Sequence, residues 1–323
     1  MTTINSLQEV FLRMGEKGAG AVKGNKQLLG ALSVTITSIC YGLVPSFSFI
    51  AFGMGVETET LLFNKFLYAA IIMWAYLLIR KVDFKLTRRA AITMIITCAG
   101  YIGMSTSLYV SFDYISGSLA TIISFTFPAM IVAIEMITKM EPVRFAKILA
   151  VILSFGGLVL IVWDPDMHAN LIGVLFAFGA AVGYVIYIFG LSAKSIKHVD
   201  SFAVAGYVMA SAAAVNFVRC LMSGKPLFAT EPNQIGMMIL LSVVCVFMAI
   251  LFYAIGVRLI GPGNAALVNT MEPVLACIFG HFLVGDVLTH VMLIGSALVV
   301  AAVLITNLPE RKQREQHKEN NST

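Results

Sequence analysis

Long runs of apolar residues, separated by short polar or charged breaks, make up most of the chain. A helix needs about 20 predominantly apolar residues to cross a bilayer. Lipid also requires such a helix to satisfy its own backbone hydrogen bonds. The pattern therefore predicts an all-α integral membrane protein with ten transmembrane helices. They are expected at residues 27–52, 60–79, 90–111, 116–138, 145–163, 170–191, 201–222, 235–256, 263–284 and 289–307.

The composition agrees with this pattern. Of the 323 residues, 59% are hydrophobic and only 12% are charged, and the mean hydropathy is +0.90. Soluble domains carry about 25% charged residues. The composition therefore excludes a water-soluble enzyme, a disordered chain and a nucleic-acid-binding protein.

The cysteines predict neither disulfides nor a metal site. Their number is odd, no two of them form a CxxC pair, and no His stands at ligand spacing from any of them. All five lie in apolar runs, where cysteine behaves as a small buried hydrophobic residue. They are Cys40, Cys98, Cys220, Cys245 and Cys277.

Basic residues are distributed unevenly between the two sides of the predicted membrane protein. With the N-terminus inside, the tails and inner loops hold 19 of the 22 Lys and Arg residues, whereas the outer loops hold only Arg219 and Lys225. Basic residues accumulate in the cytoplasmic loops of membrane proteins. The bias predicts a multi-pass protein of the plasma or inner membrane. Its two tails, residues 1–26 and 308–323, are expected in the cytoplasm.

The chain repeats itself at about half its length. When the sequence is shifted by 145 positions, Phe127 falls on Glu272, and with one residue of slack Tyr109 falls on Tyr253. Because each half would hold five helices, an odd number, the second half enters the membrane from the opposite side. Inverted repeats of this kind are typical of secondary transporters. The two predicted repeats are residues 27–163 and 170–307.

Short motifs stand at corresponding places in the two halves. In the first half they are Tyr41-Gly42, Lys65-Phe66, Pro128, Glu141 and Gly156-Gly157; in the second half they are Glu272-Pro273, Gly285-Asp286 and Gly295. Together they resemble the EamA-type transporters of the drug/metabolite transporter superfamily over residues 27–307. The resemblance implies a ten-helix, inverted-repeat secondary carrier of small metabolites, often directed outward. Relatives typically carry Arg where Lys65 stands, and Lys keeps the charge but lacks the guanidinium fork.

Three charged residues lie inside predicted spans: Lys65, Glu135 and Glu272. Each would cost about 2.5–3.5 kcal/mol at a helix centre unless a partner or water compensates it. Glu135 is near the inner end and four residues before Lys139, so a surface ion pair explains it. Lys65 is six residues in from the outer end of its helix. Its side chain either extends outward to the interface or attracts an anionic group of a substrate.

Glu272 lies near the middle of its predicted span, where a short side chain cannot reach the interface. The adjacent Pro273 lacks a backbone donor and would free the carbonyl of Asn269. With the Asn269 side chain, these groups predict a polar pocket in which Glu272 binds substrate and exchanges a proton during transport. The alternative is a protonated or amide-paired Glu that serves only helix packing.

Tyrosines recur near the middle of the predicted spans. Aromatic rings with a hydroxyl suit a pocket that binds amphipathic organic solutes. The mid-span tyrosines are Tyr41, Tyr101, Tyr109, Tyr184, Tyr187 and Tyr253. The predicted substrate-binding residues are Lys65, Glu272, Asn269, Tyr41, Tyr101, Tyr184 and Tyr253.

Missing motifs narrow the function further. The sequence has no GxxxxGK[ST] loop for an ATP motor, no HExxH or GxSxG, and mostly short loops. We therefore expect a permease or exporter of small organic metabolites, such as amino acids, that is not an enzyme and needs no cofactor or metal. A membrane-embedded enzyme or a channel is the alternative. The expected partners are the substrate, membrane lipid and protons as coupling ion, without nucleic acid, in a monomeric protein.

Overall fold

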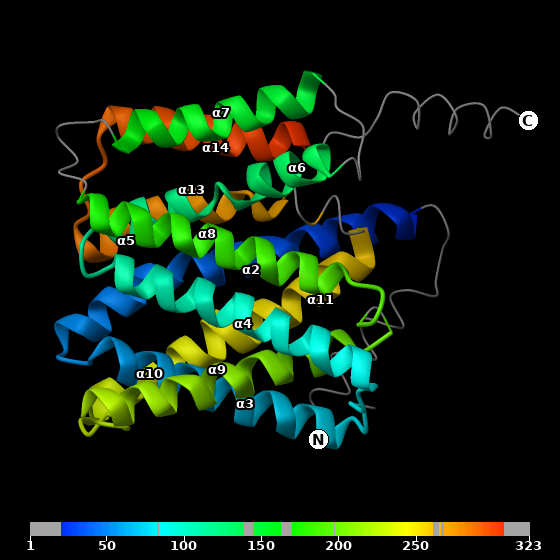
Figure 1. The fold of residues 1–323 in the computed structure, drawn as a ribbon, viewed down its shortest axis with the longest axis vertical. Helices are drawn as coiled ribbons and strands as arrows, with labels where there is room; N and C mark the ends of the chain where they lie inside the picture. Colours follow the sequence, from blue (N-terminus) through cyan, green and yellow to red (C-terminus); the bar gives the residue numbers. More distant parts are fainter. Residues whose placement is uncertain are drawn as a thin grey trace, which may run out of the picture.

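The protein forms a bundle of helices (Figure 1). The computed structural model describes residues 21–82, 84–138, 145–162, 170–196, 198–260, 265 and 268–306. Every regular element within these ranges is a helix. Residues 1–20 and 308–323 of the predicted tails, and Glu141, lie outside them, whereas residues 21–26 of the predicted N-terminal tail belong to the first helix. The helices are α2 (Ala21–Gly53), α3 (Thr58–Ile79), α4 (Arg88–Ser111), α5 (Gly117–Ser124), α6 (Phe127–Ile137), α7 (Phe145–Val162), α8 (Leu171–Ser192), α9 (Ser201–Ser223), α10 (Pro232–Ser242), η2 (Val243–Met248), α11 (Ala249–Ile260), α13 (Met271–Phe279), η3 (Gly280–Val284) and α14 (His290–Thr306).

Many of these helices have the dimensions of membrane spans. Among the described residues, seven helical stretches are long and apolar enough to cross a membrane, and each coincides with a window predicted from the sequence. Three shorter apolar helices correspond to the remaining windows. These are Ile148–Leu160, Met271–Val284 and His290–Ala302.

The main helix pairs join the first part of the chain to the second. α4 packs along α8, α3 along α9, α7 along α14, and α2 along both α11 and α13. Figure 1 shows α7 and α14 side by side at one edge of the bundle, with α3 and α9 toward the opposite edge. In each pair one helix precedes residue 163 and the other follows residue 170. The two parts of the chain are therefore interleaved rather than packed as separate bodies.

Glycines allow two of these pairs to approach closely. A Cβ atom on Gly183 of α8 would lie 2.5 Å from the backbone nitrogen of Met104 in α4. One on Gly157 of α7 would lie 2.7 Å from the carbonyl oxygen of Gly295 in α14. Small residues of this kind let membrane helices pack backbone against backbone.

Two of the predicted spans are interrupted. Phe125 and Thr126 form a turn between α5 and α6, and Thr270 forms a turn directly before α13. Pro128 and Pro273 stand in the first turn of the helix that follows, where the missing backbone donor is tolerated. The sequence pattern predicts a single span at each of these places, residues 116–138 with a kink at Pro128 and residues 263–284 with Pro273 inside it. Pro273 therefore marks the start of a helix, and Glu272 belongs to the first turn of α13.

Candidate functional site

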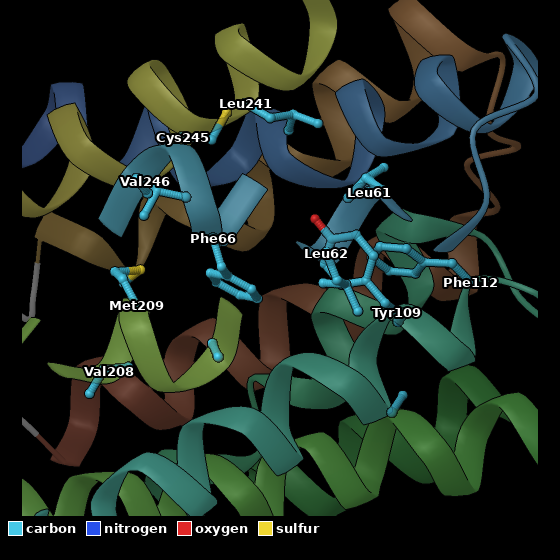
Figure 2. Close-up of a cluster of buried hydrophobic side chains, with 14 of the residues drawn as sticks. Leu61, Leu62, Phe66, Tyr109, Phe112, Val208, Met209, Leu241, Cys245 and Val246 are labelled. Carbon is cyan, nitrogen blue, oxygen red and sulfur yellow. The ribbon is translucent and has the colours of Figure 1, made fainter. Parts of the chain in front are cut away.

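Lys65 is a buried basic residue in the first half of α3. Its residue is only 5% exposed, and its Nζ donates a hydrogen bond of 2.8 Å to the hydroxyl oxygen of Tyr109. The ammonium also lies 4.5 Å from the ring centre of Tyr109 and 4.9 Å from that of Phe66. Figure 2 shows both rings among the buried side chains around α3. No carboxylate of the described residues forms an ion pair with Lys65. Its amino group contacts the hydroxyl and ring of Tyr109 and the ring of Phe66 instead.

The hydroxyl of Tyr109 connects Lys65 to α2. It lies 2.9 Å from Oγ of Ser48, and Ser48 Oγ donates to the carbonyl of Val44 at 2.6 Å. A serine hydroxyl has one proton, so when Ser48 donates to Val44, Tyr109 is the donor between the two hydroxyls. The hydrogen bonds therefore run in one direction, from Lys65 through Tyr109 and Ser48 to Val44.

Glu272 forms a second polar centre. Its Oε2 accepts a hydrogen bond of 3.1 Å from Nδ2 of Asn269, whose own Oδ1 accepts one of 3.1 Å from Ser38 of α2. The first turn of a helix favours a negative charge because its backbone N–H groups point toward it. Gly42 permits close contact here, since a Cβ atom on it would lie 2.9 Å from Cβ of Leu275 in α13. The predicted association of Glu272 with Asn269 is thus present in the structure.

Three of the predicted tyrosines lie within electrostatic range of Glu272. Tyr41, Tyr184 and Tyr253 lie close enough to its carboxyl group to interact with it electrostatically, and they come from α2, α8 and α11. Four elements therefore contribute to this centre. Residues that are far apart in the sequence are brought together by the pairing of α2 with α11 and α13.

A row of aromatic rings links the two polar centres. Successive ring centres are separated by 5.9, 5.2, 5.8 and 4.1 Å. The row runs through Phe66, Tyr101, Tyr187, Tyr184 and Phe127. Tyr101, the remaining predicted tyrosine, thus lies between the Lys65 side and the Glu272 side.

The structure adds residues to the predicted set. Tyr109, Tyr187 and Ser48 were not assigned to the site, although the first two were noted as mid-span tyrosines. The spacing of Tyr187 to Tyr184 carried a signal, because residues three apart share a helix face. Nothing in the sequence marked Ser48, whose role depends on a contact between α2 and α4.

Two ion pairs join the start of α3 to the C-terminal end of α9 and the residues just after it. Lys225 lies 2.8 Å from Glu57, and Arg219 lies 3.3 Å from Glu59. The hydrogen bond from Lys225 to Glu57 raises the pKa of the lysine. Burial, followed by the nearby charges of Glu59 and Glu57, raises the pKa of Asp113.

Two clusters of three aromatic rings lie at opposite ends of α3 and α9. The Phe63 cluster contains Phe63, Phe217 and Phe228, with Phe63 5.6 Å from each of the others. The Tyr207 cluster contains Trp74, Phe84 and Tyr207, with Trp74 5.4 Å from each of the others. In the second cluster the Tyr207 hydroxyl also donates a hydrogen bond of 2.7 Å to the carbonyl of Phe84.

Comparison with known proteins identifies the family. The profile of the EamA-like transporter family matches residues 28–163 and again residues 171–308. The threonine/homoserine exporter RhtA of Escherichia coli (strain K12) is 23% identical over 211 residues, 65% of this chain and 69% of that protein. The uncharacterized transporter YcbK of Bacillus subtilis (strain 168) is 21% identical over 301 residues, 90% of this chain and 96% of that protein.

A solved crystal structure shares the fold. It aligns with a TM-score of 0.61 at 17% sequence identity, covering 85% of this chain and 96% of the other. The two profile matches span most of the sequence and confirm the resemblance seen in its motifs. The chain belongs to the EamA-like transporter family and is a multi-pass membrane protein.

Proposed function

We propose that the protein is a secondary transporter that moves small organic metabolites, such as amino acids or related compounds, across the cell membrane by alternating access. The observation that carries the proposal is the buried Lys65, which has no carboxylate partner among the described residues. A buried charge is costly and marks functional sites in membrane proteins. Transporters of a related sequence, including one named as a threonine/homoserine exporter, support the substrate class.

Ten helices in two inverted repeats are part of this proposal. In two equivalent halves, each helix has a counterpart in the other half. Replacing every helix by its counterpart turns the α4–α8 pair into the α11–α2 pair and turns the α3–α9 and α7–α14 pairs into themselves, so all four pairs fit a repeat. The turns that interrupt the two spans also fit a repeat, because the helices after them, α6 and α13, begin 144 positions apart. Broken helices at matching places in the two halves are typical of the binding sites of secondary transporters.

The aromatic clusters support the same relationship. An offset of 144 positions places Phe63 on Tyr207 and Phe84 on Phe228, while Trp74 falls beside Phe217. The two clusters thus correspond to each other at opposite ends of the α3–α9 pair. With both termini in the cytoplasm, the Phe63 cluster is external and the Tyr207 cluster is internal.

The substrate would lie between the two polar centres. Lys65 would bind an anionic group, and the tyrosines between Lys65 and Glu272 would stack against the organic part of the molecule. Glu272, with Asn269 beside it, would bind a second polar group and exchange the coupling proton. The ammonium, the aromatic hydroxyls and the carboxyl group would each bind a different part of the substrate.

Counterflow in proteoliposomes tests the function. Vesicles are loaded with an unlabelled metabolite, and uptake of the same labelled metabolite is followed; threonine and homoserine head a panel of amino acids and organic acids. A carrier gives a transient overshoot that saturates with substrate, whereas a channel gives none. Protein-free vesicles are the control. Absence of an overshoot for every metabolite in the panel would contradict the proposal.

A further inference from the structure

We propose that Lys65 is a carboxylate-binding site and that Tyr109 and Ser48 are positioning residues that hold its ammonium group in place. This inference rests on the proposed function and narrows its substrate class to molecules with a free carboxylate, such as amino acids and organic acids. Ser48 lies on α2, Lys65 on α3 and Tyr109 on α4, so the site depends on three helices.

The ammonium group has unused hydrogen-bonding capacity. A protonated lysine has three N–H donors, and one of them is directed at the Tyr109 hydroxyl. That is its one hydrogen bond among the described residues. A carboxylate can accept charge-assisted hydrogen bonds from the remaining donors.

The direction of the hydrogen bonds fixes what Tyr109 offers to Lys65. Since the Ser48 proton is donated to Val44, the Tyr109 proton is donated to Ser48, and the phenol oxygen presents a lone pair to the ammonium. Removing the Ser48 hydroxyl would free the phenol to turn its proton toward Lys65. Ser48 therefore positions Lys65 without touching it.

The uncharged groups around Lys65 would make its site prefer an anionic ligand to a neutral one. A carboxylate partner within the protein would neutralise the ammonium, whereas Tyr109 and the Phe66 ring leave its net charge unchanged. A ligand carboxylate would supply the missing charge. An uncharged amide of the same shape would leave the ammonium unpaired in a buried place, which is unfavourable.

The test measures thermal stability of the purified protein in detergent, with acetate as the probe. A ligand that binds the folded state stabilises it by RT ln(1 + [L]/Kd), so the rise in melting temperature with ligand concentration reports the Kd. Sodium acetate is titrated against sodium chloride at equal ionic strength, and neutral acetamide is the uncharged comparison. We expect acetate alone to raise the melting temperature of the parent and of Lys65→Arg. Lys65→Met should show no acetate response.

The positioning role is tested with Ser48→Ala. Loss of one neutral hydrogen bond should shift the half-saturating acetate concentration upward by roughly threefold to tenfold. Ser48→Thr should restore the parent value. Ser46→Ala is the matched control, because Ser46 is also buried on α2 but its hydroxyl has no hydrogen-bond partner in the described part of the chain. In a Tyr109→Phe background, Ser48→Ala should cause no further shift.

Two results would overturn the proposal. One is an acetate response that Lys65→Met retains or that the parent lacks; the other is a Ser48→Ala variant with the parent's acetate titration. Neither measurement requires transport. A protein that binds acetate through Lys65 but shows no counterflow would contradict the proposed function and retain only the assignment of Lys65 as a carboxylate-binding site.

Discussion

Phe63 of α3 and Tyr207 of α9 lie 144 positions apart, and each contacts a phenylalanine beyond the end of a helix in the other half of the chain. The ring of Phe63 lies 5.6 Å from that of Phe228, and the hydroxyl of Tyr207 donates to the carbonyl of Phe84. Both contacts are formed in this structure. If the protein works by the proposed alternating access, the two ends of the α3–α9 pair open in turn, and each contact breaks once in a transport cycle.

Cross-linking either contact should therefore stop transport. In a background without the native cysteines, Phe63→Cys with Phe228→Cys, or Phe84→Cys with Tyr207→Cys, is joined by a short thiol cross-linker. Counterflow should fall to the level of protein-free vesicles and return when the link is reduced. The matched control is Trp74→Cys with Phe84→Cys, since these neighbours belong to the same half. Full transport by a completely cross-linked Phe63–Phe228 pair would contradict a gating role.

The orientation predicted from the basic residues can be measured by thiol labelling. Met54 between α2 and α3 is 39% exposed, and Lys81 after α3 is exposed, whereas all five native cysteines are buried. A membrane-impermeant maleimide applied to intact cells should label Met54→Cys at once. Lys81→Cys should react only after the membrane is permeabilised. The reverse pattern would place both termini outside.

Helix positions were predictable to within a few residues because span length and apolar character are set by the bilayer itself. The interruptions at Thr126 and Thr270 were not predictable in the same way. Both lie inside apolar windows, and a window average does not register a turn of one or two residues. Pro128 and Pro273 were visible signals, but a proline inside a run can mark either a kink or the start of a helix.

The site was predictable where residues close together in the sequence carry its parts. Asn269 and Glu272 are only three residues apart, on either side of the turn at Thr270, and they form a hydrogen bond. The hydrogen bonds from Lys65 to Tyr109 and from Tyr109 to Ser48 span 44 and 61 positions. They depend on how three helices pack, which no local pattern encodes.

A contact between Asp286 and Ser118 should stabilise the folded protein. The Asp286 Oδ2 accepts hydrogen bonds from Oγ of Ser118 at 2.6 Å and from its backbone nitrogen at 3.3 Å, at the N-terminus of α5. A carboxylate at this position also interacts favourably with the helix dipole. Asp286→Asn is expected to cost about 1 kcal/mol, seen as a lower melting temperature of the purified protein.

Ser118→Ala tests whether that loss comes from the contact. The double variant should then be less destabilised than the sum of the two single variants, because both changes remove the same hydrogen bond. Additive losses would show that Asp286 and Ser118 stabilise the protein independently.

The proposed coupling role of Glu272 can be tested by removing its titratable group. Glu272→Gln keeps the shape of the side chain and an oxygen that can accept from Asn269, which lies 3.1 Å from the carboxylate. The amide cannot release a proton. The variant should therefore bind substrate and exchange it in counterflow, where no net proton movement is required. Uphill uptake driven by a pH difference should disappear.

Both assays are run on the same proteoliposomes, so that the amount of active protein is equal in the two measurements. Asn269→Ala is the control, because it removes the hydrogen bond but retains the titratable group; it should weaken both activities together. A Glu272 that serves only helix packing would make the two activities of Glu272→Gln fall in parallel or not at all. If Glu272→Gln accumulates substrate in a pH gradient as the parent does, the proton is carried elsewhere, and Glu272 binds substrate without coupling its transport.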